Sequence, residues 1–232
     1  MTRSQSVEDY LKAIYKLENE IEGGVSTSRL ASEMGVASAS VTNMVKRLSD
    51  MGMVEYESYY GARLTETGEK IALEIIRHHR LLELYLKEVM GYSWDEVHEE
   101  AEKLEHHISE QFEDKIAELL DHPDFDPHGD PIPDKEGKMP AFKSRSLINI
   151  PLNVPYIIRR VKNQNPELLR YLEKQGLLPG VKIEVTQREP FEGPVQLKVE
   201  NEKMAIGFSV AEDIFVVEPD IATGYDPLDS DK

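Results

Sequence analysis

The stretch STSRLASEMGVASASVTNMVKRLSDMGMVEYESYYGARL, residues 26–64, decides the fold of the N-terminal part of this chain. A capped short helix ends at Gly35, and a second helix is predicted at about 38–51. Two short strands then form a hairpin around Tyr60-Gly61. Apolar residues at helical spacing predict another helix before the stretch, at 6–22. This order of elements is typical of a winged helix-turn-helix.

The helix at 38–51 has the composition of a DNA-recognition helix. Its first exposed positions are small or hydroxyl-bearing, which lets a helix sit deep in the major groove, and the amide of Asn43 can pair with adenine. Basic residues beside it can hold phosphates. A winged helix can instead mediate protein contacts, but the whole pattern favours DNA. The candidate DNA-binding residues are Arg29, Ser38, Ala39, Ser40, Thr42, Asn43, Lys46 and Arg47.

Few of these side chains read bases, so we expect a homodimer on a two-fold site in double-stranded operator DNA. The net charge of the 232-residue chain is −17, which argues against nonspecific nucleic-acid binding by the whole surface. The charge is uneven: residues 1–64 carry a net of −2, and residues 71–130 a net of −12. The N-terminal part can therefore present a local basic face, whereas the acidic middle would attract divalent cations.

The chain has no cysteine, and no apolar run approaches the length of a membrane span. We therefore expect a cytoplasmic protein without disulfides and without a membrane partner.

Two helical stripes in the middle of the chain carry potential metal ligands. Helices are predicted at 66–90, from a capping box at Ser93, and at 109–121. Steps of three and four residues place side chains on one face of a helix. Imidazole and carboxylate are ligands of Mn, Fe or Zn. The stripes consist of His79 and Glu83, then His98, Glu102, Glu105 and His106.

The C-terminal part changes character after a turn-rich segment at 122–140 and a linker near 134–146. Strands are predicted at 147–161, 181–188, 194–200, 203–208 and 214–218, with a helix at 166–175, which together indicate a small β-barrel. The predicted fold class is mainly α with small β parts. Its divisions are a DNA-binding domain at 1–70, a helical metal-binding and dimerisation domain at 71–140, a barrel at 147–219 and an acidic disordered tail at 220–232.

A metalloenzyme is the competing class of function. A ferritin-like site needs Glu-x-x-His on helices, but Lys103 and Leu104 stand three residues before His106 and His107. His98-Glu99 also lacks the second His of the zinc-protease motif, and the sequence has no phosphate loop or nucleophile elbow. We therefore expect no enzyme activity and no small-molecule substrate.

The chain resembles the diphtheria toxin repressor / manganese transport regulator family of metal-dependent transcriptional repressors over nearly its whole length. The motifs that carry the resemblance are Ser6-Val7-Glu8-Asp9-Tyr10-Leu11, Ser40-Val41-Thr42-Asn43-Met44-Val45, His78-His79-Arg80-Leu81-Leu82-Glu83, His98 to Glu102, Leu104-Glu105-His106 and Pro127-His128-Gly129-Asp130-Pro131-Ile132-Pro133. The part from Pro166 to Gly180 looks like the family's SH3-like (FeoA-like) domain.

The resemblance implies two metal sites per chain and repression of metal-uptake genes. The primary site would use Asp9, Glu102, Glu105 and His106. The ancillary site would use His79, Glu83 and His98, with Gln164 and Glu167 added from the SH3-like domain.

Departures from the family pattern bear on the metal. Glu102 and Asp9 stand where iron-type regulators have Cys and Met. This harder ligand set favours Mn(II), with Fe(II) as the close alternative, and other divalent metals are expected to bind in vitro. Lys12 replaces a Glu of short manganese regulators, so we expect two separated sites and not a binuclear cluster. Asp126 and His128 are possible extra ligands, or else part of a structured turn.

Four other residues near these motifs are predicted to be structural. His78, His107 and His122 are expected to cap helices or lie at the surface, and Trp94 to pack in a core.

Overall fold

The computed structural model describes residues 4–21, 23–141, 143–200 and 202–219. It divides the chain into two compact units, and each is described by itself. Unit 1 comprises residues 1–79, 102–115 and 133–139, and unit 2 comprises residues 80–101, 116–132 and 140–232. The tail from Asp220, predicted to be disordered, lies outside the described residues.

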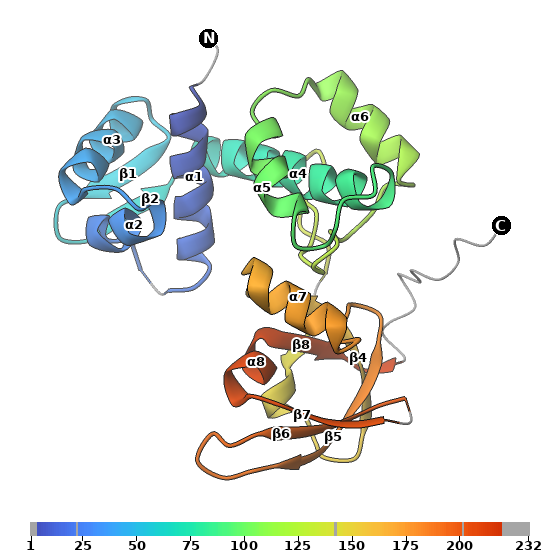
Figure 1. The fold of residues 1–232 in the computed structure, drawn as a ribbon. Coiled ribbons are helices and arrows are strands. Elements are labelled where there is room, and N and C mark those ends of the chain that lie inside the picture. The colour runs from blue at the N-terminus through green and yellow to red at the C-terminus, as the bar shows by residue number, and fades with distance from the viewer. Residues whose placement is uncertain (1–3, 22, 142, 201, 220–232) are drawn as a thin grey trace. The chain divides into compact units, whose positions relative to one another are not determined.

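The predicted winged helix-turn-helix is confirmed in unit 1 (Figure 1). The hydroxyl of Ser26 accepts a hydrogen bond from the Arg29 amide at the start of the second helix, and Gly35 ends that helix in the left-handed conformation that glycine favours. The wing is an antiparallel hairpin in which Val54 pairs with Leu64. The elements are α1 (Gln5–Glu18), α2 (Thr27–Met34), α3 (Ser38–Asp50), β1 (Val54–Glu57) and β2 (Gly61–Leu64).

One apolar core holds these elements together. The core contains five fully buried side chains: Leu11 and Ile14 of α1, and Val41, Val45 and Leu48 of α3. Their helical spacing buries one face of each helix and leaves the opposite face of α3 exposed.

Three helices follow: α4 (Glu66–Glu88), α5 (Val97–Leu104) and α6 (Glu110–Leu119). Residues 66–79 of α4 belong to unit 1 and residues 80–88 to unit 2. Ser93 and Glu96 make the predicted capping contact, with 2.5 Å between the hydroxyl and carboxylate oxygens. The helix nevertheless begins at Val97, because the intervening Trp94 turns into the core of unit 2, where its indole donates to the Pro127 carbonyl.

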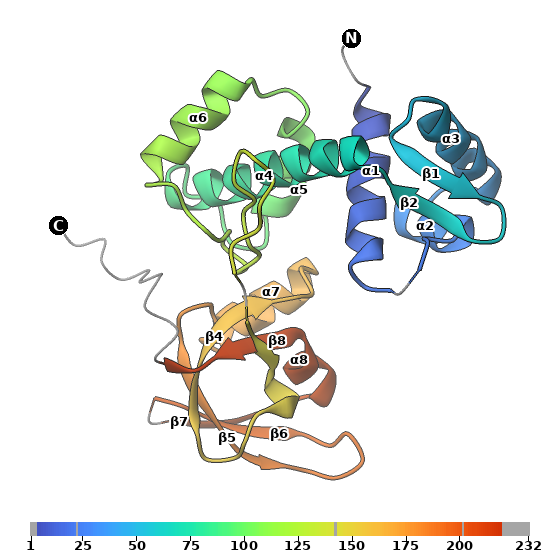
Figure 2. The same ribbon diagram turned by 180° about the vertical axis from the view of Figure 1, so that it is seen from behind.

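Unit 2 contains a six-stranded antiparallel sheet in the order β3-β8-β4-β5-β6-β7, which curls around one core (Figure 2). Bulges interrupt the β4–β8 and β5–β6 ladders, and bulges bend and twist strands. The strands are β3 (Arg145–Ser146), β4 (Pro155–Val161), β5 (Lys182–Arg188), β6 (Val195–Val199), β7 (Glu202–Ile206) and β8 (Ile214–Val217); α7 (Pro166–Lys174), α8 (Phe208–Asp213) and the 3-10 helix η1 (Leu147–Asn149) complete the unit.

The single strand predicted at 147–161 is wrong in its first half. Residues 147–149 form η1, and Asn153 has a positive φ of 58°, which a strand cannot accommodate. The short helix α8 was not predicted, whereas the packing role of Trp94 is confirmed by its 2% exposure. In the described part of the chain, no helix is long and apolar enough to cross a membrane.

Candidate metal centres and DNA-binding surface

Asp9, Glu105 and His106 come together in unit 1, and their ligand atoms lie within 4.8 Å of one another. Asp9 lies in the first turns of α1, and Glu105 and His106 directly follow α5. His106 Nε2 lies 2.8 Å from Asp9 Oδ1 and 3.4 Å from Glu105 Oε1. This buried nitrogen makes no hydrogen bond within the described residues despite these short distances. Such an atom, facing two carboxylates, fits a divalent cation.

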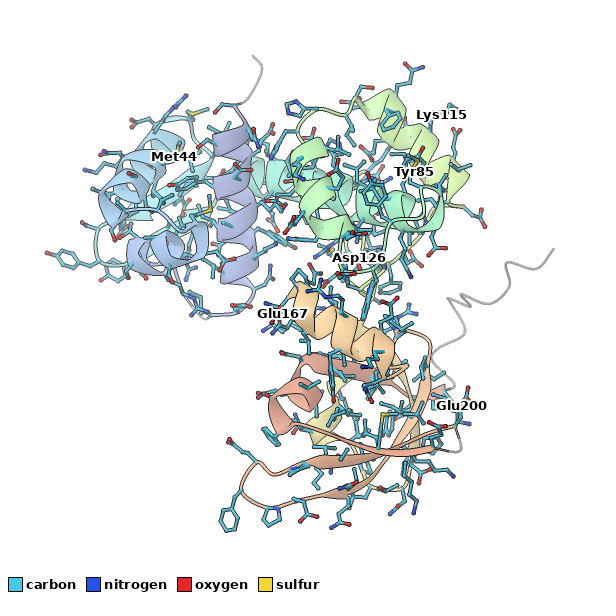
Figure 3. All side chains as sticks on the ribbon, in the orientation of Figure 1. Met44, Tyr85, Lys115, Asp126, Glu167 and Glu200 are labelled. Carbon is cyan, nitrogen blue, oxygen red and sulfur yellow. The ribbon has the colours of Figure 1, made fainter. Side chains whose placement is uncertain are left out.

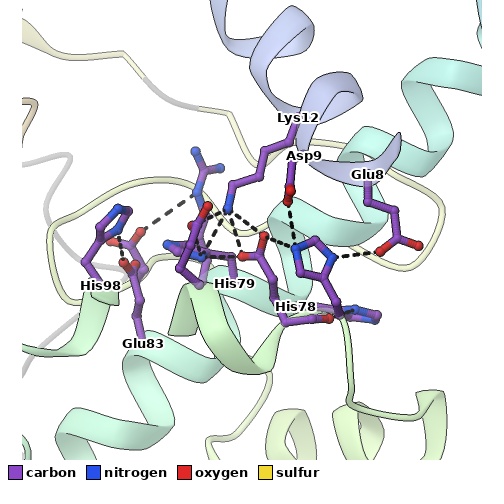
Figure 4. A network of polar contacts seen from close by, with 12 residues as sticks. Glu8, Asp9, Lys12, His78, His79, Glu83 and His98 are labelled. Atoms are coloured by element: carbon purple, nitrogen blue, oxygen red, sulfur yellow. Dashed lines mark hydrogen bonds and ion pairs between the residues drawn. The ribbon is translucent and has the colours of Figure 1, made fainter. Parts of the chain in front are cut away.

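Glu102, the fourth residue predicted for the primary site, contacts Lys12 of α1. The two side chains are 2.7 Å apart, Lys12 Nζ to Glu102 Oε2. The same ammonium lies 2.7 and 2.8 Å from the two oxygens of Glu105 and 3.3 Å from His79 Nδ1. Figure 4 shows Lys12 extending from α1 toward His79, with dashed lines marking its contacts. We call the set Asp9, Lys12, His79, Glu102, Glu105 and His106 the Glu105 cluster.

The charges in this cluster shift two carboxyl pKa values in opposite directions. Burial raises the pKa of Asp9 above 3.8, the His106 charge opposes that rise, and the Glu102 and Glu105 carboxylates add to it. Burial also acts to raise the pKa of Glu102, but the charge and hydrogen bond of Lys12, together with His79, lower it from 4.5 to about 2. The ionised form is therefore disfavoured at Asp9, whereas Lys12 favours it at Glu102.

Two supports of this cluster were not predicted as site residues. Glu8 lies 2.7 Å from His106 Nδ1, which orients the imidazole so that Nε2 faces Asp9. The surface position predicted as one alternative for His78 is wrong, because this residue is only 5% exposed; it contacts Glu113 and the backbone carbonyl of Glu105, just after the end of α5, at 2.9 and 3.1 Å. The sequence carries no signal for either contact, since each partner comes from a distant segment. His107 and His122 are exposed, as predicted.

The residues predicted for the ancillary site are divided between the two units. Glu83 and His98 lie together in unit 2, with His98 Nδ1 3.0 Å from Glu83 Oε1. His79 belongs to unit 1, where its Nδ1 is 2.5 Å from Glu105 Oε2. Gln164 donates to Asp130 Oδ2 at 3.0 Å, and Glu167 is exposed in the first turn of α7.

Asp126 and His128 complete a buried group with Glu83 in unit 2, and the three ligand atoms lie within 4.8 Å of one another. His128 is 0% exposed and stacks on Trp94, with ring centroids 5.6 Å apart. Asp126 Oδ2 and His128 Nδ1 are buried without a hydrogen bond in the described residues. We call Glu83, His98, Asp126 and His128 the His128 cluster; Figure 3 labels Asp126.

A tight turn holds this cluster in place. Asp126 Oδ1 accepts hydrogen bonds from the amides of His128 and Asp130, at 2.8 and 2.9 Å. Gly129 has a φ of +88°, and a Cβ there would lie 1.8 Å from the Arg159 carbonyl oxygen, so the turn packs directly on β4. The predicted alternatives therefore coexist, because the structured turn itself brings Asp126 and His128 to Glu83.

The pKa values of both Asp126 and His128 are raised in the His128 cluster. Burial, Asp130 and Glu83 raise the pKa of Asp126, although the charges of His128 and Arg80 oppose the rise. Burial acts to lower the pKa of His128, but the Glu83 carboxylate, with Oε2 3.6 Å from His128 Nδ1, and the Asp126 charge raise it above 6.5. A buried carboxylate pair beside an imidazole is a donor set that a divalent cation would satisfy.

The candidate DNA-binding residues lie on the exposed part of unit 1. Ser38, Ala39, Ser40 and Asn43 are exposed on α3. The hydroxyl of Thr42 donates to the Ser38 carbonyl at 2.9 Å, so toward a bound partner this hydroxyl can only accept hydrogen bonds. Lys46 and Arg47 are exposed too, and Arg29 pairs with Glu20 at 3.1 Å.

Family models match all three parts of the chain. Residues 3–62 match the N-terminal DNA-binding domain of iron-dependent repressors, and residues 65–134 match their metal-binding and dimerisation domain. Residues 145–218 match the FeoA domain.

Curated relatives and solved structures agree with these matches. The iron-dependent repressor IdeR of Mycobacterium tuberculosis is 30% identical over 194 residues, which is 78% of this chain and 83% of the relative. The transcriptional regulator MntR of Lysinibacillus sphaericus is 36% identical over 115 residues, which is 50% of this chain and 81% of the relative. A manganese-dependent transcriptional repressor in complex with manganese is 33% identical, with a TM-score of 0.83 over 91% of this chain and 99% of the other. ScaR with bound Zn²⁺ is 34% identical, with a TM-score of 0.75 over the same shares of the two chains.

Proposed function

The chain belongs to the diphtheria toxin repressor / manganese transport regulator family of metal-dependent transcriptional repressors, and on this premise we propose that it binds operator DNA as a homodimer when loaded with Mn(II). Members of this family are regulators and not enzymes. We propose the same division of labour along the chain: DNA binding by 1–70, metal binding and dimerisation by 71–140, and an SH3-like domain at 147–219.

The convergence of Asp9 with Glu105 and His106 carries the proposal. Asp9 lies on α1, the helix that packs against the recognition unit, and Glu105 and His106 lie beyond α4 in sequence. A divalent ion held by these residues would supply a positive charge that links α1 to the segment at 102–115. The position of α1 would thereby be set by side chains outside the DNA-binding segment.

Burial and carboxylate repulsion at Asp9 make this contact sensitive to a bound cation. Burial and the neighbouring Glu102 and Glu105 charges raise the pKa of Asp9, so its ionised form is disfavoured while the negative charge remains uncompensated. The state with Asp9 ionised and close to His106 is the one that a cation selects. By linkage, DNA that prefers the same state must tighten metal binding by the same factor.

The donor set supports Mn(II), with Fe(II) as the alternative. It consists of carboxylate oxygen and imidazole nitrogen, and the chain has no cysteine. Hard oxygen ligands suit Mn(II), and Fe(II) accepts the same set. Among the relatives, IdeR is named for iron dependence and the solved repressor for manganese.

We propose a second ion in unit 2, at the His128 cluster. Glu83 and His98 are retained from the sequence-predicted ancillary site, and Asp126 and His128 are added because they face Glu83. The buried Asp126 Oδ2 makes no hydrogen bond in the described residues and lies 3.8 Å from Arg80 Nε, which supports the addition of an oxygen ligand here. The metal-binding roles predicted for His79, Gln164 and Glu167 in the ancillary site remain predictions.

Exposed apolar residues of unit 2 support the proposed dimer. Val89, Met90 and Tyr92 follow the end of α4, and Leu119 ends α6; they are 47%, 56%, 38% and 61% exposed. Apolar side chains of this size are characteristic of the centre of a homodimer interface.

Fluorescence anisotropy on promoter DNA of a metal-uptake gene, with EDTA, Mn(II), anaerobic Fe(II) and Zn(II) in parallel, tests the function. Binding is expected with Mn(II) or Fe(II) and not in EDTA. Equal binding in EDTA would reject metal activation while leaving DNA binding intact.

Glu105→Gln tests the assignment of the site. The amide keeps the shape of the buried side chain but loses its charge, so metal-dependent DNA binding should be lost while the chain stays folded. Glu99→Gln, on the exposed part of α5, is the matched control and should respond as the wild type. A wild-type metal response in Glu105→Gln would remove Glu105 from the site.

A further inference from the structure

Glu18, the last residue of α1, binds the backbone of the wing. Its Oε1 accepts a hydrogen bond from the Leu64 amide at 3.1 Å, and Leu64 is the last residue of β2. The two residues are 46 positions apart in the sequence. Both views of unit 1 show β2 beside α1 (Figures 1 and 2). The contact therefore joins the first helix of the chain to the end of the wing.

The Glu18 carboxylate completes the outer edge of the wing. Alternate residues of a strand point their amides to the same edge, so the Ala62 and Leu64 amides both point away from β1. The Ala62 amide donates to the Val25 carbonyl at 2.9 Å, and the Val25 amide donates back at 2.8 Å. Glu18 accepts from the next amide along this edge. A hairpin of two short strands is marginal alone, so its orientation depends on the contacts at this edge.

The same helix carries Asp9 of the Glu105 cluster. Asp9 and Glu18 are nine positions apart, which is two and a half helical turns, so they face opposite sides of α1 about 13 Å apart along its axis. Asp9 faces His106, at 2.8 Å, and Glu18 faces β2. The buried Leu11 and Ile14 lie between them in the core of unit 1. A displacement of α1 at Asp9 is thus carried to the wing.

The wing exposes side chains that suit DNA. Tyr59 and Tyr60 are 99% and 77% exposed at its tip, and Arg63 is exposed on β2. Tyrosine hydroxyls and guanidinium groups are donors to phosphate and sugar oxygens. Burial raises the pKa of Glu18, and the Arg63 charge opposes that rise, so the two side chains interact as well. The positions of these wing side chains follow from β2, whose end is held by Glu18.

We propose that Glu18 is a positioning residue that ties the wing to α1, so that a metal ion bound at Asp9 also sets where the wing side chains lie against operator DNA. The inference rests on the proposed function in that Asp9 takes part in binding the ion. It adds the wing to the parts of the chain that respond to metal.

Hydrogen exchange of the full chain, followed by mass spectrometry with and without Mn(II), tests the proposal. In the wild type, Mn(II) should slow amide exchange both in peptides that cover 102–108 and in peptides that cover the wing at 54–64. Glu18→Met keeps an unbranched side chain of similar length but removes the acceptor. It should lose the Mn(II)-dependent protection of the wing and keep that of 102–108.

Operator binding provides the second readout. In Mn(II), Glu18→Met should bind operator DNA about fivefold more weakly than the wild type, which is the effect of one hydrogen bond, while it binds the same number of Mn(II) ions. Glu18→Gln retains an oxygen acceptor and should restore both the affinity and the wing protection. Glu69→Met is the control: it removes an exposed carboxylate near Glu18 and should behave as the wild type.

Glu18→Asp covers the case in which Glu18→Met fails to fold. It keeps the charge but is one methylene shorter, so its carboxylate does not reach the Leu64 amide. The wing protection and the operator affinity should fall as in Glu18→Met.

The outcomes separate the two proposals. If Mn(II) protects 102–108 but not the wing of the wild type, or if the folded Glu18→Met or Glu18→Asp variant keeps wild-type wing protection, the role of Glu18 is overturned and the metal site stands. If Mn(II) leaves exchange at 102–108 unchanged in the wild type, the metal site itself is misassigned, and both proposals fall.

Discussion

Glu113 is a single residue whose charge should make stability depend on pH. It is 5% exposed, accepts from Arg77, and lies 2.9 Å from His78 Nε2. Burial acts to raise the pKa of Glu113, but His78 and Arg77 outweigh it and hold the pKa below 4.5. Because the folded state favours the ionised form, this stabilisation is complete above pH 4.5 and is lost as the pH falls through the lower, folded-state pKa.

Glu113→Gln should therefore lower the free energy of unfolding at neutral pH by about 1 to 3 kcal/mol. The difference from the wild type should shrink as the pH falls below 4.5. Urea denaturation in EDTA at several pH values measures this difference in unfolding free energy. Glu110→Gln, at an exposed position on the same helix, is the control and should have little effect. If the loss of unfolding free energy in Glu113→Gln did not change with pH, Glu113 would contribute through its shape and not through its charge.

At the same scale, the sequence predicted which residues would meet in the Glu105 cluster but not how they pair. Spacing and resemblance indicated Asp9, Glu102, Glu105 and His106, and the structure groups three of them. Glu102 pairs with Lys12, whose ammonium lies 2.7 Å away and lowers the pKa of that carboxyl. That choice depends on side chains from α1, α4 and α5 together, which no one segment of sequence reveals.

The recognition helix α3 allows base contacts to be separated from phosphate contacts. Asn43→Ala should weaken binding to the operator by about 1 to 3 kcal/mol and relax selectivity at one base pair. Lys46→Ala should weaken binding to all DNA sequences. It should also reduce the magnitude of the slope of the logarithm of the binding constant against the logarithm of salt concentration by about 1. Lys70→Ala makes the same charge change on α4, where Lys70 pairs with Glu66, and should leave the slope unchanged.

These effects can be measured by anisotropy on operator and scrambled DNA over a range of salt concentrations. Equal losses on both DNAs for Asn43→Ala would assign it to the phosphate backbone. An unchanged slope for Lys46→Ala would place this side chain outside the interface.

Elements with strong local signals were predicted well, and those fixed by tertiary packing were not. Gly35 ends α2 as expected, Ser26 caps its start, and Asn165 caps α7. The β3 strand has only two residues, and α8 has six, so neither carries enough periodicity to be recognised. Their conformations follow from pairing with β8 and packing on the sheet core.

For the whole molecule, the two proposed ion sites belong to different units and should be removable one at a time. Asp126→Asn keeps the turn's hydrogen-bond acceptor but removes a buried charge, and should weaken the unit 2 ion roughly tenfold or more. At a metal concentration that saturates the Glu105 cluster, it should bind one ion fewer than the wild type. Asp124→Asn, exposed in the same segment, is the control. Metal analysis after dialysis gives the count, and an unchanged count would assign Asp126 to turn structure alone.

The stacking of Trp94 on His128 also gives the chain an optical reporter. Trp94 is the sole tryptophan of the sequence, it is 2% exposed, and its indole is fixed by the Pro127 carbonyl. Its emission therefore registers events around His128, whether cation capture there or exposure of the sheet core to solvent. The Glu105 cluster has no such fluorophore of its own. A stepwise metal titration followed at this wavelength would consequently record the filling of one centre, while total metal content records both.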